Sequence, residues 1–135
     1  MNKPITQKHF MSCGLACVAY IVGKNYDELA SLQSKKKLDS TGFYCPGLVL
    51  LLKQHGYNYK WRKLSKNEKY PVFNNGDIVF IARSPEMPNG HFLTKTLYGW
   101  MDPWSNLAKT KNLKKAKSSF RENLPSEPSY IIYAA

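Results

Sequence analysis

The spacing of the apolar residues changes once along this chain, close to Gly56. Before that glycine, apolar residues recur at helical spacing, and we expect helices at residues 13–22, 26–33 and 48–54. After it, the residues alternate or form short continuous apolar runs, which predicts strands at residues 57–61, 77–82, 91–94, 97–102 and 130–133. Helices followed by an antiparallel sheet indicate the α+β class, with an N-terminal helical part packed on a C-terminal sheet.

Two segments lie outside this pattern. Lys109–Phe120 is predicted to form a basic helix on the surface, and Ser40–Gly42 is predicted to be a loop. The chain has 135 residues, 43% of them hydrophobic, which is enough to bury one core. We therefore expect a single domain spanning residues 1–135, without internal repeats or a linker.

The chain is strongly basic, with 20 Lys and Arg residues against nine Asp and Glu residues and a net charge of +11. Much of the excess lies in Lys35–Lys37 and Lys109–Arg121, and such runs attract acidic partners. No RNA-recognition, helix-turn-helix or zinc-finger pattern accompanies the lysines, so nucleic acid is not the expected partner. Two interpretations stay open: an acidic partner binds at Lys109–Arg121, or the lysines only form a solvated surface.

Neither a membrane span nor a secretion signal is visible in the sequence. The longest apolar run, Leu15–Val22, is far shorter than the ~20 residues that a span requires. Met1–Pro4 leads into polar residues instead of an apolar signal core, which makes the cytoplasm the default compartment and leaves open secretion without a cleaved signal. The three cysteines of such a chain are expected to be thiols.

Cys13 is the thiol best placed for chemistry. An ordinary cysteine, with a pKa of ~8.5, is mostly protonated at neutral pH, and the N-terminus of a helix favours the thiolate. Ser12 is the predicted N-cap of the first helix, and Cys13 lies in its first turn beside Gly14, which has no side chain to obstruct a substrate. Cys17 lies inside the apolar run and Cys45 at a helix start, so both are expected to be structural.

His91 is the candidate base among the three histidines. His9 is expected to be exposed in the loop before Cys13, and His55 is explained as a cation at a helix C-terminus. Asp102 comes eleven residues after His91, the separation expected if neighbouring strands carry the two side chains. We therefore predict that Asp102 orients the imidazole of His91.

Gln7 completes the candidate machinery. It lies six residues before Cys13, and its side-chain amide is predicted to stabilise an oxyanion together with the backbone N–H of Cys13.

A zinc site built from His9, Cys13 and Cys17, which are spaced four apart, is the metal alternative. No ligand pair of CxxC or HxxxH type accompanies these residues, so we expect no metal ion. Thiol chemistry needs no cofactor, and none is predicted.

These residues resemble the C39 peptidase family, the papain-like domains that cut leader peptides after a double glycine at the head of bacteriocin export transporters. Gln7, five further residues and Cys13 to Cys17 match its pattern of Gln followed by Cys-Gly-x-Ala-Cys, and Gly90–Leu93 and Asp102–Pro103 match its histidine and aspartate motifs. The resemblance covers nearly the whole chain and implies a papain-like cysteine peptidase fold. It also implies Cys13 as the nucleophile, His91 as general base and acid, Asp102 as the orienting residue and Gln7 as the oxyanion donor.

The resemblance leaves the substrate open. No membrane or ATP-binding region follows, so a free-standing domain is expected, and Trp104–Asn106 stand where the family usually has a glycine. The function expected is cleavage of a peptide bond in a peptide or protein through a Cys13 acyl-enzyme. The alternatives are an acyl transferase or amidase with the same residues, or an inactive module that binds a peptide or an acidic partner.

Overall fold

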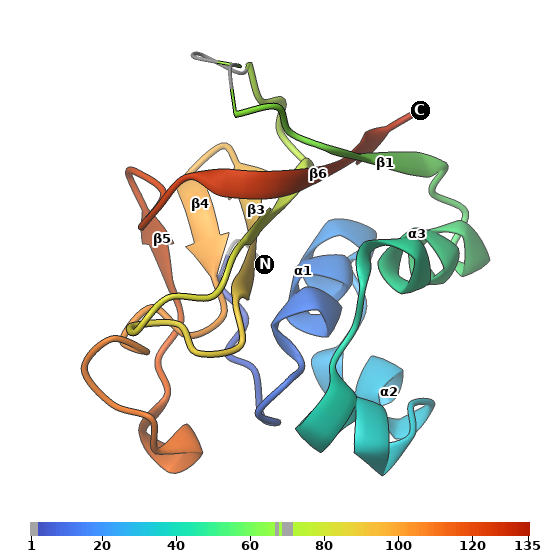
Figure 1. Ribbon diagram of the computed structural model, residues 1–135. Coiled ribbons are helices and arrows are strands. Elements are labelled where there is room, and N and C mark those ends of the chain that lie inside the picture. The colour runs from blue at the N-terminus through green and yellow to red at the C-terminus, as the bar shows by residue number, and fades with distance from the viewer. Residues whose placement is uncertain (1–2, 67, 69–71) are drawn as a thin grey trace.

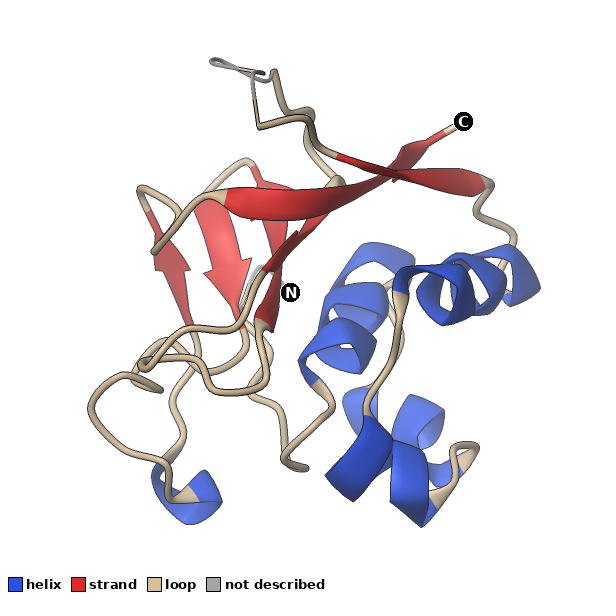
Figure 2. Ribbon diagram, viewed as in Figure 1, coloured by secondary structure: helices blue, strands red, loops and turns tan. Residues whose placement is uncertain are grey.

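The helices and strands occupy separate parts of the molecule, as the computed structural model of residues 3–66, 68 and 72–135 shows (Figure 1). The helical part contains α1 (Cys13–Val22), α2 (Tyr26–Ser31), the short π-helical turn η1 (Lys37–Thr41) and α3 (Cys45–Gln54). The strands are β1 (Tyr59–Lys63), β2 (Ile78–Ile81), β3 (His91–Thr96), β4 (Gly99–Asp102), β5 (Ser119–Arg121) and β6 (Pro128–Ala134). This arrangement confirms the predicted α+β class and is consistent with a papain-like fold (Figure 2).

The six strands found in the described part of the chain form one antiparallel sheet in the order β1-β6-β2-β3-β4-β5. Because side chains alternate between the two faces of a strand, neighbouring residues enter different cores. Phe92 belongs to the core shared with the helices, whereas Leu93 belongs to a second core on the opposite face. Met101 and Trp100 on β4 divide in the same way.

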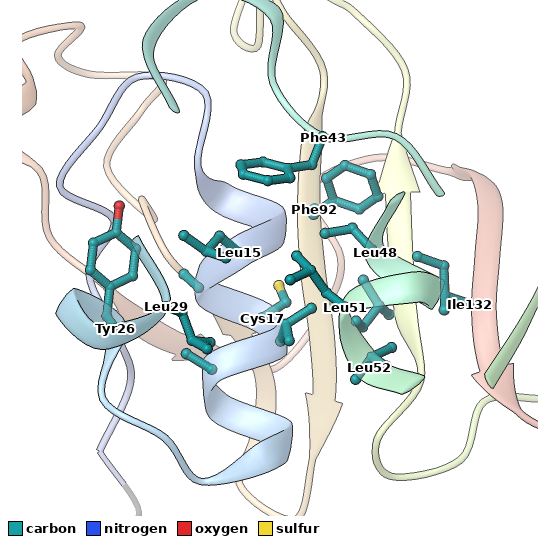
Figure 3. Packing of buried hydrophobic residues seen from close by; sticks show 14 of the residues in the cluster. Leu15, Cys17, Tyr26, Leu29, Phe43, Leu48, Leu51, Leu52, Phe92 and Ile132 are labelled. Atoms are coloured by element: carbon teal, nitrogen blue, oxygen red, sulfur yellow. The ribbon is translucent and has the colours of Figure 1, made fainter. Parts of the chain in front are cut away.

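Helix α1 lies in the middle of the larger core, between α2, α3 and strand β3 (Figure 3). Every residue from Gly14 to Ala19 is buried, in agreement with the prediction of a central helix. A Cβ atom on Gly14 would lie 2.7 Å from Cδ1 of Leu48 on α3 and 3.2 Å from Cδ2 of Phe92 on β3. Gly14 therefore serves the close packing of α1, rather than access for a substrate as the sequence suggested.

The ends of the helices follow local signals. Gly23 after α1 has φ 69° and Gly56 after α3 has φ 87°, the left-handed conformation that glycine adopts most readily. His55 is the C-cap of α3, as predicted. Ser12 occupies the N-cap position of α1, but its hydroxyl donates to the carbonyl of His9 and does not cap the helix.

The predicted helix at Lys109–Phe120 is wrong. Its central part is an extended loop with one 3₁₀ turn, η2 (Leu113–Lys115), and Phe120 lies in β5 opposite Met101. Asn106 holds this loop by donating to the carbonyl of Lys115 and accepting from the N–H of Lys117. Tertiary pairing of β5 with β4 thus overrides the local preference of a lysine-rich segment.

Two smaller corrections concern the ends of predicted elements. Ser40 and Thr41 are part of the π-helical turn η1 instead of a loop. Strand β4 starts at Gly99 because Leu97 and Tyr98 form the tight turn after β3. Within the described residues, no helix combines the length and the apolar character needed to cross a membrane.

Candidate active site

Cys13 is the first residue of α1, and its half-buried side chain faces a groove of about 820 Å³. This groove runs between the helical part and the sheet, since residues 40–46 line it from one side and Phe80, Phe92 and Tyr130 from the other. The position at the helix N-terminus places the sulfur at the positive end of the helix dipole.

His91 opens β3 and reaches the same groove. The preceding Gly90 has φ 73°, and a Cβ atom there would lie 2.2 Å from Cζ of Phe80, so only glycine permits this approach of the chain. The His91 side chain is 3% exposed, and its Nε2 is 2.5 Å from Oδ1 of Asp102. With Nε2 engaged, Nδ1 is the nitrogen left for chemistry at the groove.

Asp102 ends β4, and its side chain is only 1% exposed. Both carboxylate oxygens are bonded, because Oδ1 accepts from His91 and from the N–H of Trp104 at 2.9 Å, and Oδ2 accepts from Nε of Arg121 at 2.6 Å. The sequence prediction that neighbouring strands bring His91 and Asp102 together therefore matches the geometry.

The electrostatics of this pair favour its charged form. Burial opposes the imidazolium, but the charge and hydrogen bond of Asp102 outweigh it and raise the pKa of His91 to about 10, with a further contribution from Cys13. Burial likewise opposes ionisation of Asp102, and the charge of His91 with the three hydrogen bonds lowers the pKa of that carboxyl. His91 is thus held as an imidazolium that interacts with the Cys13 side chain.

The other two thiols differ from Cys13 in burial. Cys17 is fully buried in the core beneath Cys13, and its burial raises the pKa of its thiol well above the ordinary value. Burial also raises the pKa of Cys45 to about 11. Both are therefore protonated at neutral pH, which agrees with the structural role expected for them.

Gln7 is buried at the edge of the groove, but its amide is already engaged. Its Nε2 donates to the carbonyls of His9 at 3.0 Å and Phe10 at 3.1 Å, and its Oε1 has no hydrogen-bond partner among the described residues. Donation to a substrate oxygen therefore requires that one of these two bonds be exchanged. The oxyanion role of Gln7 stays a prediction.

The loop before Cys13 is held by a hydrogen-bond network that the sequence did not suggest. The hydroxyl of Tyr26 on α2 lies 2.6 Å from Oγ of Ser12 and 2.8 Å from Nδ1 of His9, and it accepts from the N–H of Lys8 at 3.2 Å. His9 is consequently half-buried against Tyr26, so the prediction that it is exposed is wrong.

Arg121 is the site residue that sequence reasoning missed, because it was counted only as the last residue of the basic stretch Lys109–Arg121. Only three of the 20 basic residues are arginines, and arginine suits buried carboxylates better than lysine does. That rarity was the signal that could have singled it out.

The groove is apolar with a basic rim. Besides His91, the described residues that line it include many aromatic side chains and the basic side chains of Arg83 and Lys111, but no Asp or Glu. Three of the aromatic side chains are strongly exposed, namely Phe10, Tyr44 and Trp61. Such a lining favours an apolar or neutral-to-acidic ligand over a basic one.

The described residues contain no group of three or more His, Cys, Asp or Glu side chains that could hold a metal ion. His9, one of the three residues of the zinc alternative, is within hydrogen-bond distance of the Tyr26 hydroxyl through its Nδ1.

The comparison with known proteins gives one match. A model of the peptidase C39 family matches residues 2–123 of the chain. No curated protein and no solved structure matches it.

Proposed function

The chain belongs to the peptidase C39 family, which indicates a cysteine-peptidase type of function, and we propose that Cys13, His91 and Asp102 carry it. The observation that supports this most strongly is the buried bond between Nε2 of His91 and Oδ1 of Asp102, beside a cysteine at a helix N-terminus. A thiolate next to an imidazolium is the form of cysteine that attacks carbonyl groups.

The proposed reaction has two halves. The Cys13 thiolate forms a C–S bond to the carbonyl carbon of a peptide, and the carbonyl electrons move to oxygen. As the C–N bond breaks, Nδ1–H of His91 gives its proton to the leaving amine, and an acyl-enzyme remains. A water molecule then attacks the acyl carbon while His91 takes its proton, and the C–S bond breaks to restore the thiolate.

Each further residue has a defined part in this reaction. Asp102 keeps the imidazole turned so that Nδ1 faces the sulfur, and it stabilises the imidazolium. The backbone N–H of Cys13, joined by the Gln7 amide after exchange of one bond, stabilises the oxyanion. The aromatic groove binds an extended peptide or protein segment.

The test is alkylation of the purified protein by iodoacetamide, located by mass spectrometry over a range of pH. We expect Cys13 to react at about pH 6, where an ordinary thiol is slow, because the imidazolium of His91 stabilises its thiolate. Cys17 and Cys45 serve as internal controls, since both are buried and stay unlabelled while the protein is folded. The enhanced rate at low pH should disappear in His91→Ala.

Slow labelling of Cys13, with the pH profile of a free thiol and no response to His91→Ala, would favour an inactive binding module. If labelling is fast, a peptide screen with Cys13→Ala as the inactive control follows. Adding an amine nucleophile then separates hydrolysis from acyl transfer, because a transferase yields an amide product where a peptidase yields an acid.

A further inference from the structure

Arg121 reaches the candidate site from the edge of the sheet. It is the last residue of β5 and pairs with Trp100, two residues before Asp102 on β4, so the side chains of Arg121 and Asp102 lie on one face of the sheet. Its Nε donates to Oδ2 of Asp102 at 2.6 Å, and a second guanidinium nitrogen donates to the carbonyl of Ser105 at 2.8 Å.

The bond to Arg121 occupies the carboxylate oxygen that His91 leaves free. Asp102 is 1% exposed while Arg121 is 30% exposed, and Arg121 lines a second cavity together with His91 and Asp102 instead of the groove. Without the guanidinium, one oxygen of a buried anion would lack its protein donor, and the carboxylate could rotate about its last side-chain bond. A rotated carboxylate no longer aligns the imidazole.

We propose that Arg121 is a positioning residue, which holds Asp102 in place and through it aligns the imidazole of His91 with Cys13. This inference rests on the proposed function of Cys13 and His91. The planar guanidinium suits the task because its two bonds, to Asp102 and to Ser105, fix the direction of approach as well as the distance.

Arg121 also shares the charge of Asp102 with His91. Its positive charge competes for the carboxylate, so removal of the charge alone would raise the pKa of His91, whereas loss of the Asp102 alignment lowers it. The remaining charged or ionisable side chains that line the two cavities bordering His91 are Cys13, Tyr44, Cys45, Arg83, Glu86, Lys111 and Tyr130. None of these is changed by a substitution at position 121, so a shift in the titration of His91 reports on Arg121.

A merely structural role is the competing explanation, because the bond to Ser105 also ties the loop after Asp102 to β5. Two variants separate the roles. Arg121→Met removes both the charge and the bonds, and Arg121→Lys keeps the charge without the two-point geometry. Arg62→Lys is the matched control, because Arg62 binds the Glu68 carboxylate through two nitrogens and its own side chain does not line the groove.

The first readout is the NMR titration of the His91 imidazole in a Cys13→Ala background, which does not depend on peptidase activity. We expect the midpoint to move downward in Arg121→Met and, by a smaller amount, in Arg121→Lys, because a displaced Asp102 stabilises the imidazolium less well. The second readout is the rate of Cys13 alkylation at about pH 6, which we expect to fall about tenfold in both variants and to be unchanged in Arg62→Lys.

Two results would overturn the proposal. One is a His91 midpoint that is unchanged or raised in a folded Arg121→Met protein. The other, decisive if Arg121→Met does not fold, is a Cys13 alkylation rate in Arg121→Lys equal to that in Arg62→Lys. A failure of the proposed function looks different, because Cys13 of the parent protein would then react as an ordinary thiol while the His91 titration still responds to Arg121.

Discussion

The His91 imidazole and the Asp102 carboxylate are charged groups that water barely reaches, so their ionisation is coupled to folding. The pKa of His91 is raised from 6.5 to about 10 in the folded protein, because Asp102 outweighs the effect of burial. A raised pKa contributes stability that is fully present below the unfolded value and is lost as the pH rises through the folded value. The lowered pKa of Asp102 acts in the opposite sense, since its contribution is lost as the pH falls.

We expect the advantage of the parent protein over Asp102→Asn in the free energy of unfolding to shrink as the pH rises from 6.5 to about 10. The neutral amide cannot stabilise the imidazolium, so the variant lacks this part of the pH dependence. Urea unfolding at several pH values measures the difference, and comparison within the pair cancels the titration of the lysines. A difference that stays constant across this range would contradict a charged His91–Asp102 pair.

At the scale of the elements, the site depends on how closely α1 approaches β3. Gly14 makes this approach possible, because a Cβ atom there would overlap Leu48 and press against Phe92, the residue after His91. Cys13 and His91, the proposed nucleophile and base, are therefore brought together by a packing contact one residue away from each. A change in that contact should affect stability and reactivity together.

We expect Gly14→Ala to destabilise the protein by about 1–3 kcal/mol, because the added methyl group overpacks the junction of α1, α3 and β3. The rate of Cys13 alkylation at about pH 6 should also fall, since α1 shifts away from His91. Urea unfolding and mass spectrometry measure the two effects.

Gly47→Ala is the matched control for this substitution. Gly47 also lies in a helix, but a Cβ atom there would meet nothing within 4 Å. It should leave stability unchanged or raise it by up to about 1 kcal/mol, without altering the reactivity of Cys13. Equal effects of the two substitutions would remove the special role of Gly14.

For the whole molecule, the net charge of +11 and the basic side chains of the groove lining both favour negatively charged ligands. Arg83 and Lys111 line the groove, and the other lysines of the loop that contains Lys111 are exposed. Negatively charged reactants should therefore be concentrated near Cys13, and salt should weaken this effect.

Two alkylating reagents of different charge test this electrostatic attraction without a known substrate. We expect the ratio of the Cys13 alkylation rates by anionic iodoacetate and neutral iodoacetamide to exceed that of a free cysteine by on the order of tenfold at low salt. The ratio should fall with added salt and in Arg83→Gln, but not in Arg62→Gln, whose side chain does not line the groove. A ratio independent of salt would make the basic surface a solvated face with no bearing on the site.

Sequence reasoning succeeded where the relevant interactions are local or the candidates few. Three histidines and nine carboxylates left little choice, and His91 and Asp102 stand where two predicted strands begin and end. The errors came from contacts across long distances in the chain. The three residues that end at Arg121 form a strand because they pair with β4. The Ser12 hydroxyl forms a hydrogen bond with Tyr26 instead of capping its helix.

The α+β class, the central helix with Cys13 at its start and the resemblance to the family could all be predicted from the sequence. These follow from the spacing of apolar residues and from short motifs, which act over a few residues. The contacts of the folded chain were needed to show that Arg121 holds Asp102, that the Gln7 amide donates to two carbonyls, and that Gly14 allows close packing. Each of these depends on which surfaces meet when the sheet and the helices pack together, and local spacing does not encode that.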